Sequence, residues 1–289
     1  MDALVTAFVA SSRFTRLRPE SQRSYRGIMD RLRTEHGTKT IANLQPRHIR
    51  MMLDKRADTP TAANALRNVL RQLMRYAVAL DWRSDNPVDG VEKVRHRTDG
   101  HHAWTESEIH AFEGFHPAGS RARLALALLL YTGQRRGDVV KMGPGNLRTG
   151  ERNGKPATVL DLIQGKTGKN LTLPVLPLLA DALALAPPGT TFIQGATGRP
   201  MTPEGFSNWF VEAAREAGLP KGCSPHGLRK AAARRLAQAG CSTHQIAAWT
   251  GHASLGEVQR YSQSVEQESL AWAGAERLGL ARTGEPMRE

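Results

Sequence analysis

Apolar residues recur every three or four positions along the first ninety residues, the spacing that gathers them on one face of an α-helix. This pattern predicts four helices, in the stretches ALVTAFVA, SYRGIMDRL, PRHIRMMLDKRA and TAANALRNVLRQLMRYAVAL. The last helix is expected to start at Thr59 and Pro60, because threonine is a favoured cap and proline suits the first helical position. Residues 1–90 are therefore expected to form an all-helical domain.

The next stretch, SDNPVDGVEKVRHRTDGHH, is rich in proline, glycine and charge and has no apolar period. Such a composition is typical of a linker, which we place at 91–103. Thr105 and Glu108 then have the spacing of a capping box, which marks the start of a new helix. A second domain is expected over 104–289.

This second part combines helical patterns with a short β pattern. Two helices are expected near 105–115 and 120–131, and the runs ATVLDLI and NLTLPV, separated by QGKTGK, predict a hairpin. Later helices are expected at 176–186, 203–217, 226–239, 243–250, 255–263 and 266–278. Their start signals are Thr202 with Pro203, Ser224 with Pro225, and capping boxes that begin at Ser242 and Ser254. The fold class is therefore mainly α with a small β-sheet (α+β).

Composition adds a strong positive charge to this picture. The 289 residues include 40 Lys+Arg and 27 Asp+Glu, a formal net charge of +13, and the first 100 residues carry most of the excess. This balance favours a polyanionic partner, with nucleic acid as the first hypothesis. A charge that serves only solubility is the alternative.

The number of cysteines and the length of the apolar runs indicate the cellular compartment of the protein. Cys223 and Cys241 are too few for a disulfide framework and fit a reducing cytoplasm. No apolar run reaches the roughly 18 residues of a membrane span, and the N-terminus lacks a signal-peptide pattern. We expect a soluble cytoplasmic protein with no membrane partner.

The stretch CSPHGLRK has the pattern of an anion site. If Ser224 caps a helix that begins at Pro225, His226 and Arg229 lie one turn apart near the positive end of the helix dipole. Free backbone N–H groups point the same way, which suits a phosphate. The alternative is that both side chains are ordinary solvated surface.

The same region also contains two Cys-x-x-His pairs. Cys223 with His226 and Cys241 with His244 have the spacing of two halves of a zinc site. The residues between the pairs are predicted to be helical, which separates the two halves by roughly 20 Å at the usual rise per residue. A shared tetrahedral metal is therefore not expected.

Two further motifs contain reactive or charged side chains next to a Thr-Gly pair. YTGQRRGDVV places Arg135 and Arg136 directly after an apolar helix, and WTGHASLGEVQRYSQ places Tyr261 nine residues after His252. A lone tyrosine in such a helix is more often packed in a core or an interface than reactive. Neither motif indicates a function by itself, so the motifs have to be considered together.

In combination, TGQRRGD, GKTGK, HGLR and TGHASLGEVQRY, in this order over residues 132–261, resemble the motifs of the tyrosine recombinases, also called phage integrases. The resemblance implies an N-terminal core-binding domain before a catalytic domain. It also implies a catalytic set of six residues: Arg135, Lys166, His226, Arg229, His252 and Tyr261.

The resemblance assigns a role to each of these residues. Tyr261 would be the nucleophile, Arg135 and Arg229 the phosphate clamp and Lys166 the general acid, with Lys169 as the second candidate for that acid. The two histidines would complete the site. Asp138 stands where the family commonly has Glu, and it is expected to hold Arg135 as a supporting partner.

The chemistry that the family performs explains the need for two guanidinium groups. Attack by a tyrosine on DNA develops negative charge on the non-bridging phosphate oxygens, and without a metal the arginines must stabilise it. A 3′-phosphotyrosine and a free 5′ hydroxyl conserve the bond energy, so strands can be exchanged without ATP. Neither a metal nor another cofactor is expected.

The expected substrate is double-stranded DNA at attachment or core sites. The basic helices predict DNA contacts, mostly to phosphates; the candidates are Arg23, Arg26, Arg67, Arg71, Arg75 and Lys169. The family implies a homo-tetramer on paired sites, and SVEQESLAWAGAERLGL could pass to a neighbour or pack on its own domain. Accessory DNA-bending proteins are possible further partners, and a bacterial, nucleoid-associated location is implied.

Within the family, TGHASLGEVQRYSQ is more similar to integrases of prophages and mobile elements than to the Xer recombinases that resolve chromosome dimers. Many phage integrases carry an arm-binding domain before the core-binding part, and this chain has no room for one. Three alternatives stay open: an Xer-like recombinase, a DNA-binding regulator that no longer cuts, and a relaxing enzyme of the type IB topoisomerase kind.

Overall fold

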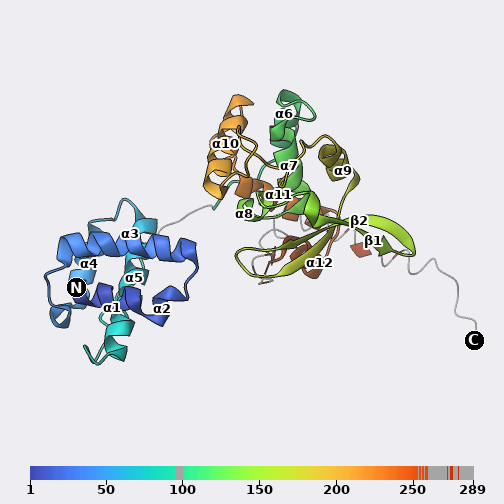
Figure 1. Cartoon of the computed structure of the whole chain (residues 1–289). Helices are drawn as coiled ribbons and strands as arrows, with labels where there is room; N and C mark the ends of the chain where they lie inside the picture. The colour runs from blue at the N-terminus through green and yellow to red at the C-terminus, as the bar shows by residue number, and fades with distance from the viewer. Residues whose placement is uncertain are drawn as a thin grey trace, which may run out of the picture. The chain divides into compact units, whose positions relative to one another are not determined.

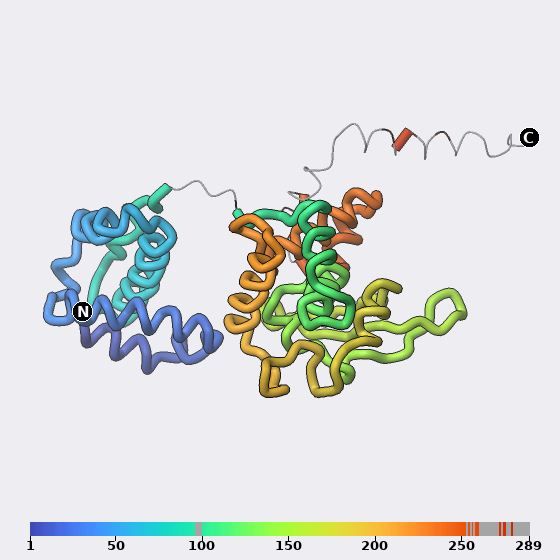
Figure 2. Tube along the Cα trace, turned by 90° about the horizontal axis from the view of Figure 1, so that it is seen from above, coloured from blue at the N-terminus to red at the C-terminus, as the bar shows by residue number. Residues whose placement is uncertain are grey.

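The computed structural model describes residues 1–95 and 100–252, together with residues 254, 256, 258, 259, 272, 274, 275 and 279. The chain divides into two compact units, Met1–Thr98 and Asp99–Glu289, whose elements can be followed in Figures 1 and 2. Tyr261, the capping box expected from Ser254 and most of the helices expected at 255–263 and 266–278 lie outside the described residues. None of the described helices is long and apolar enough to cross a bilayer.

The first unit is all helical. Its helices are α1 (Asp2–Ala10), α2 (Ser12–Thr15), α3 (Pro19–His36), α4 (Pro46–Asp54) and α5 (Pro60–Ala79), with a 3-10 turn at Ile41–Asn43. The four predicted helices are present as α1, α3, α4 and α5; the one-turn α2 is too short to show an apolar period. On α5, Leu66, Leu70 and Leu73 follow the predicted spacing, and each is buried in the core of the unit.

α5 begins at Pro60 as predicted, but the threonine before it does not cap the helix. Thr59 makes no side-chain capping bond, and its hydroxyl donates to the Arg56 carbonyl at 3.4 Å instead. Proline therefore marks this start, because its fixed φ suits the first turn and the N–H that it lacks would have no partner within the helix.

The chain after α5 folds back onto the same unit. Val88 and Val91 are buried in its core, and the side chain of Asn64 exchanges hydrogen bonds of 2.9 and 3.0 Å with the backbone of Val94. Arg67 is 4% exposed and donates to the Val91 carbonyl at 2.7 Å. Contrary to our expectation of a DNA contact, Arg67 is held inside the fold, where it fastens this returning segment to α5.

The second unit surrounds a central apolar helix with further helices and a small sheet. Its helices are α6 (Glu106–Phe115), α7 (Arg121–Thr132), α8 (Arg136–Val139), α9 (Pro177–Ala184), α10 (Pro203–Glu216), α11 (Pro225–Gln238) and α12 (Thr243–Thr250). Helix α7, which the sequence shows as RLALALLLYT, is buried along most of its length and lies among α9, α10 and α11 (Figure 1).

The sheet is antiparallel, with strands β1 (Leu147–Arg152), β2 (Lys155–Ile163) and β3 (Asn170–Pro174) in that order. The predicted hairpin is β2 and β3, whose pairing runs from Val159 opposite Pro174 to Ile163 opposite Asn170. Strand β1 was not predicted, because LRTGER is polar, largely exposed and has no alternating apolar pattern. In Figure 2 the β1–β2 hairpin extends away from the helices of its unit. The fold class is mainly helical with a small antiparallel sheet, as predicted.

Capping explains several helix starts in this unit. The boxes predicted at Thr105 and Ser242 are both formed, each with reciprocal side-chain bonds. Ser224 lies at the cap of α11 as predicted, but its hydroxyl makes no capping bond. As at α5, the proline after the cap is the signal that locates this helix start.

Candidate functional site

Two helices of the second unit end in the same Thr-Gly turn. After Thr132 at the end of α7 and Thr250 at the end of α12, Gly133 and Gly251 adopt left-handed conformations with φ of 63° and 72°. A side chain at Gly251 would lie 2.3 Å from the amide of Gln164. Glycine is therefore needed both for the backbone conformation and for close packing.

A pair of buried glutamines joins three separate segments at these turns. Gln164 directly follows β2 and is fully buried; its Nε2 donates to Gln134 Oε1 at 2.6 Å and to the Thr250 carbonyl at 2.8 Å. Gln134 Nε2 donates in turn to the carbonyls of Thr132 and Trp249, at 2.9 and 3.0 Å. The segment after α7, the β2–β3 turn and the end of α12 are therefore held together at one point.

Arg229 extends from the first half of α11 to the same point. The residue is 1% exposed, and its Nη1 donates to the carbonyls of Gly133 and Thr250 at 2.7 and 2.8 Å. A buried guanidinium is stable only when its N–H groups find acceptors. Here those acceptors are the backbone carbonyls that the two Thr-Gly turns present.

Arg135 approaches the cluster from the segment after α7. It caps α8, is half-buried, and donates from Nη1 to Gln164 Oε1 at 3.3 Å. Arg136, its neighbour, is exposed and contacts α10 instead, with bonds to Ser207 at 3.1 Å and to Glu204 at 3.7 Å. Of the adjacent arginines, Arg135 is the one that converges with Arg229.

The Asp138 side chain holds the hairpin turn and makes no hydrogen bond to the Arg135 side chain that we expected it to support; only its backbone N–H donates to the Arg135 carbonyl, at 2.8 Å. Its side chain is buried, and Oδ1 accepts from the backbone N–H of Gly165 at 2.7 Å. Oδ2 has no hydrogen-bond partner among the described residues. On the single-turn helix α8 this carboxylate faces the β2–β3 turn, so its contact with Arg135 is replaced by a contact with the hairpin.

The geometry around His252 defines which ring nitrogen carries the proton. The Thr250 hydroxyl donates its one proton to the Ile246 carbonyl at 2.6 Å, so at 2.5 Å from His252 Nδ1 it must accept. His252 Nδ1 therefore carries a proton and donates it to the Thr250 hydroxyl. Burial, followed by the charges of Arg229 and Arg135, lowers the pKa of His252 to about 3.

His226 stands at the second position of α11 and shares the same cationic surroundings. Its ring centroid lies 4.4 Å from that of His101, in the segment before α6. Although the residue as a whole is exposed, desolvation of its ring and the neighbouring His101, Arg229, Lys230 and Arg135 lower its pKa to about 4. Both histidines are neutral at pH 7 in the absence of an anion.

The two lysines of the β2–β3 turn are both exposed. The turn is closed by hydrogen bonds between Gln164 and Lys169 at 2.9 Å and between Gly168 and Gln164 at 2.8 Å. Lys166 lies at its tip, while Lys169 lies at its base and is close enough to help lower the pKa of His252. Both ammonium groups thus belong to a loop whose base is part of the arginine cluster.

The arginines that we expected to contact DNA differ in exposure. Arg23, Arg26 and Arg75 are exposed, and Arg26 also lies over the Phe14 ring at 4.9 Å. Arg71 is half-buried and pairs with Asp89 at 3.1 Å. Of the five arginines of the first unit that we expected to contact DNA, three are therefore exposed to a ligand without rearrangement.

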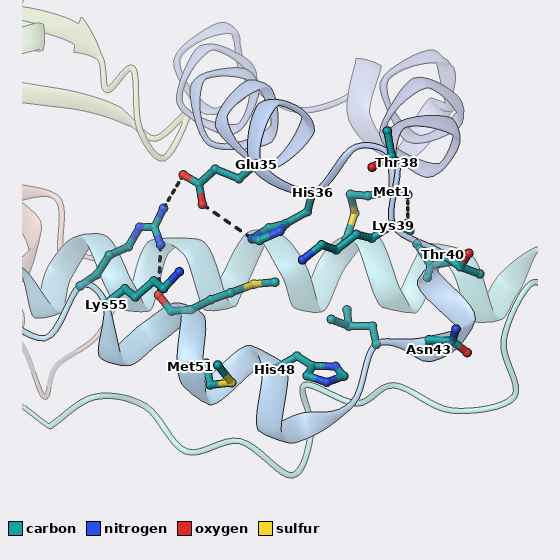
Figure 3. Close-up of a pocket in the computed structure, with 14 residues that line it drawn as sticks. Met1, Glu35, His36, Thr38, Lys39, Thr40, Asn43, His48, Met51 and Lys55 are labelled. Atoms are coloured by element: carbon teal, nitrogen blue, oxygen red, sulfur yellow. Dashed lines mark hydrogen bonds and ion pairs between the residues drawn. The ribbon is translucent and has the colours of Figure 1, made fainter.

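A separate hollow of about 530 Å³ lies in the first unit, between the end of α3 and α4 (Figure 3). Lys39, Lys55 and His48 contribute to its walls beside the exposed Met51. Glu35 at its margin pairs with Arg56 at 3.1 Å. None of its lining residues belongs to the cluster of arginines and histidines.

Sequence reasoning missed the residues that hold this cluster together. Gln134 and Gln164 are both 0% exposed, and Thr250 orients His252 through its hydroxyl and Arg229 through its carbonyl. The only signal for them in the sequence is proximity, because each lies within a few residues of a charged candidate. His101, which packs on His226, was also missed because we placed it in the linker.

Comparison with known proteins identifies the family. A profile described as the phage integrase family matches residues 105–268. The integrase of Escherichia phage HK022 is 25% identical over 234 residues, which cover 75% of this chain and 63% of the relative. XerC of Mesorhizobium japonicum is 28% identical over 247 residues, which cover 78% of this chain and 76% of the relative. The chain belongs to the phage integrase family, whose members are tyrosine recombinases.

Solved structures show the same fold. A lambda integrase fragment, crystallised as a dimer bound to a COC′ core site, has a TM-score of 0.77 at 20% identity, covering 92% of this chain and 96% of that chain. The Tn1549 transposon integrase in complex with transposon right end DNA has a TM-score of 0.74 at 16% identity, covering 96% and 98%. The helical region followed by an integrase catalytic domain is therefore the architecture of this chain.

Replacing Gln164 with leucine should destabilise the second unit. The variant leaves the buried Gln134 carbonyl oxygen and the Arg135 guanidinium without the amide they share, which should cost about 1–3 kcal/mol of unfolding free energy. Gln238→Leu, at the exposed end of α11, is the matched control and should stay within about 0.5 kcal/mol. Equal loss in both variants, measured by urea denaturation, would contradict the proposed role of the glutamine pair.

The two histidines should titrate in acid. The pKa values are lowered to about 4 for His226 and about 3 for His252. Their NMR chemical shifts should therefore stay at the values of a neutral imidazole until well below pH 6. Inorganic phosphate should raise both values, because an anion at Arg135 and Arg229 offsets the cationic field. Signals that titrate near pH 6.5 and ignore phosphate would show that the cationic cluster does not form in solution.

The same shifts predict a dependence of stability on pH. Because these folded pKa values lie below the unfolded value of about 6.5, the unfolded chain binds more protons, and stability falls as pH is lowered from that value. For His252, which is 6% exposed, the loss should approach about 1.4 kcal/mol per pH unit. His252→Gln should lose stability less steeply over this window.

Proposed function

We propose that this chain is a site-specific DNA recombinase that cuts and rejoins strands through a 3′-phosphotyrosine intermediate. The observation that carries the proposal is the convergence of Arg135 and Arg229 on Gln164 and the Thr250 carbonyl, next to His252. The bare cluster holds two permanent positive charges and two neutral imidazoles. Such a site is complementary to the anionic phosphorus centre of a DNA backbone.

The arginines take the role of the phosphate clamp. The negative charge on the non-bridging oxygens grows during attack, and guanidiniums held by buried hydrogen bonds need little reorganisation to meet it. Neutral His252 supports this role, because Thr250 fixes the orientation of its imidazole ring beside the two arginines. His226 supplies a second imidazole on the same side of the cluster.

Tyr261 is the proposed nucleophile, and it lies outside the described residues. Its phenolic oxygen forms a bond to phosphorus while the bond to the 5′ oxygen breaks, and the phenolic proton passes to a base or to solvent. A phenol has a pKa of about 10, so a strongly cationic site favours its deprotonation. The ester that forms conserves the energy of the broken bond, so rejoining needs no ATP.

Lys166 is the proposed general acid. The 5′ oxygen needs a proton as it leaves, and an ammonium on an exposed turn beside the cluster can supply it. Lys169 is the second candidate, because it stands closer to the base of the turn and influences His252. The two lysines can be separated by experiment.

The proposed substrate is a double-stranded core site, bound by both units. Exposed Arg23, Arg26 and Arg75 on α3 and α5 would contact phosphates and make binding depend on salt. Relatives of the same fold were crystallised as a lambda integrase dimer on a core site and as a tetramer on a Holliday junction. We infer a homo-tetramer on two paired sites, joined by exchange of the segment that follows Tyr261.

Integration and excision of a mobile element is the proposed biological reaction. The sequence TGHASLGEVQRYSQ supports it, because the Xer recombinases usually end this motif with Thr-Thr-Gln-x-Tyr-Thr-His. XerC of Mesorhizobium japonicum is also a relative, so resolution of chromosome dimers is the alternative. Recombination of an element's attachment site, but not of a chromosomal dimer site, would support integration and excision. The reverse result would support resolution of chromosome dimers.

A covalent adduct with DNA should form on a nicked suicide substrate. Wild-type protein should be trapped on the attachment site of its own element, whereas Tyr261→Phe should bind the DNA and give no adduct on a denaturing gel. Arg135→Ala should slow adduct formation by about 10²–10³-fold, as expected for a lost transition-state donor. The matched control, Arg136→Ala, should change the rate little, because its contacts are with α10.

Two outcomes would overturn this assignment. An adduct that persists in Tyr261→Phe would mean that another residue is the nucleophile. DNA binding by wild-type protein without any adduct, on a site that a relative cleaves under the same conditions, would favour a regulator that has lost cleavage.

Leaving-group chemistry should identify the general acid. Lys166→Ala should cleave normal DNA slowly but recover on DNA with sulfur in place of the leaving 5′ oxygen, because a thiolate leaves without a proton. Lys169→Ala should need no such rescue, and Arg135→Ala should not be rescued. Rescue of Lys169→Ala alone would transfer the role to that lysine.

A further inference from the structure

Three metal-ligating side chains meet on the second unit outside the arginine cluster. His102 precedes α6, Glu108 lies in its first turn, and Cys223 lies in the loop before α11. One donor atom from each lies within 4.8 Å of the other two. His102 Nε2 is 2.9 and 2.8 Å from the two carboxylate oxygens of Glu108.

The backbone around these side chains is built for close approach. Gly222 has φ of +109°, and a side chain there would meet His102 at 3.4 Å. A side chain at Gly227 would lie only 2.2 Å from the His102 carbonyl. The ring of Trp104 also donates to the Ser224 carbonyl at 3.1 Å. The segments that carry His102 and Cys223 are thus held together independently of any ion.

The carboxylate and the thiol are fixed in this arrangement. Glu108 Oε2 accepts from the Thr105 N–H at 2.7 Å as part of the capping box, so its direction is set by the start of α6. Cys223 is 3% exposed. Burial, together with the adjacent carboxylate of Glu108, raises the pKa of the thiol to about 12.

The donor set selects the kind of cation. One imidazole nitrogen, one carboxylate oxygen and one thiol sulfur suit zinc and similar borderline-soft ions, whereas magnesium and calcium prefer oxygen alone. The side chain of His102 is 39% exposed and that of Glu108 13% exposed, so the cluster is open to solvent on one side. Water can therefore complete a tetrahedral site.

We propose that His102, Glu108 and Cys223 form a structural zinc-type site, with water as the fourth ligand. On binding, sulfur forms a bond to the metal and its proton leaves to solvent, without change of oxidation state. The ion fastens the segment before α6 to the loop that leads into α11, the helix that carries His226 and Arg229. Cys241 and His244, the second Cys-x-x-His pair, take no part.

Cobalt is the probe that tests this site. Full-length, tag-free protein, stripped with a chelator and reduced with a phosphine, is titrated with Co²⁺. Wild-type protein should develop a sulfur-to-cobalt charge-transfer band in the near ultraviolet and strong visible bands typical of tetrahedral cobalt. Zinc should bleach these bands stoichiometrically.

The two cysteines of the chain provide the matched control. Cys241→Ser should keep the charge-transfer band, and Cys223→Ser should lose it. His102→Asn should weaken cobalt binding by at least about tenfold, since even the loss of an outer partner costs that much. His110→Asn, which changes another exposed histidine on α6, should leave binding unchanged.

Three spectroscopic results from wild-type protein and the cysteine variants would overturn the site: no charge-transfer band in wild-type protein at excess cobalt, a band that survives in Cys223→Ser, or a band lost in Cys241→Ser. Circular dichroism of each variant checks folding. Because His102 is exposed, His102→Asn keeps the test valid if Cys223→Ser fails to fold; equal binding by His102→Asn and wild type would also overturn the proposal.

Discussion

The carbonyl oxygen of Thr250 accepts hydrogen bonds from Gln164 at 2.8 Å and from Arg229 at 2.8 Å, and the rest of the candidate site depends on this one acceptor. Through it, the end of α12, the β2–β3 turn and α11 meet at one buried point. Because buried donors without partners are costly, the glutamine and the arginine hold each other in place by sharing it. Gly251, the next residue, makes room for the glutamine.

This arrangement separates the permanent charges from the groups that titrate. Arg135 and Arg229 contribute guanidinium groups, whose charge is permanent, and burial together with the surrounding positive charges keeps His226 and His252 neutral. An approaching phosphate therefore meets a site that is already fully charged where charge is needed, and whose imidazoles can still accept protons. Electrostatic preorganisation of this kind is the main contribution that a protein makes to phosphoryl chemistry.

Much of this architecture could be predicted from the sequence, because local signals determine it. The apolar period gave α5 and α7, glycines gave the turn after Gln164, and the Thr105 box gave the start of α6. The position of Arg229 one turn into α11 also follows from the proline that starts that helix. Each of these features depends on residues within one or two turns of one another.

The features that could not be predicted depend on contacts between distant segments. Arg67 belongs to the same basic pattern as exposed Arg75, yet it is buried because the chain returns over α5 and offers it the Val91 carbonyl. Asp138 is near Arg135 in sequence, but the packing of the hairpin turn decides which group it binds. Gln164 has no charge and no period, so only the fold reveals it as the residue that joins the site.

The β2–β3 turn has a buried base and an exposed tip. Gln164 is fully buried, while Lys166, two residues later, is exposed. Two residues span at most about 7 Å, so the backbone of Lys166 stays within that distance of the buried Gln164. Its effective concentration around the arginine cluster is accordingly far above that of any lysine free in solution. The turn thus keeps the ammonium group of Lys166 within a short, fixed distance of the arginine cluster.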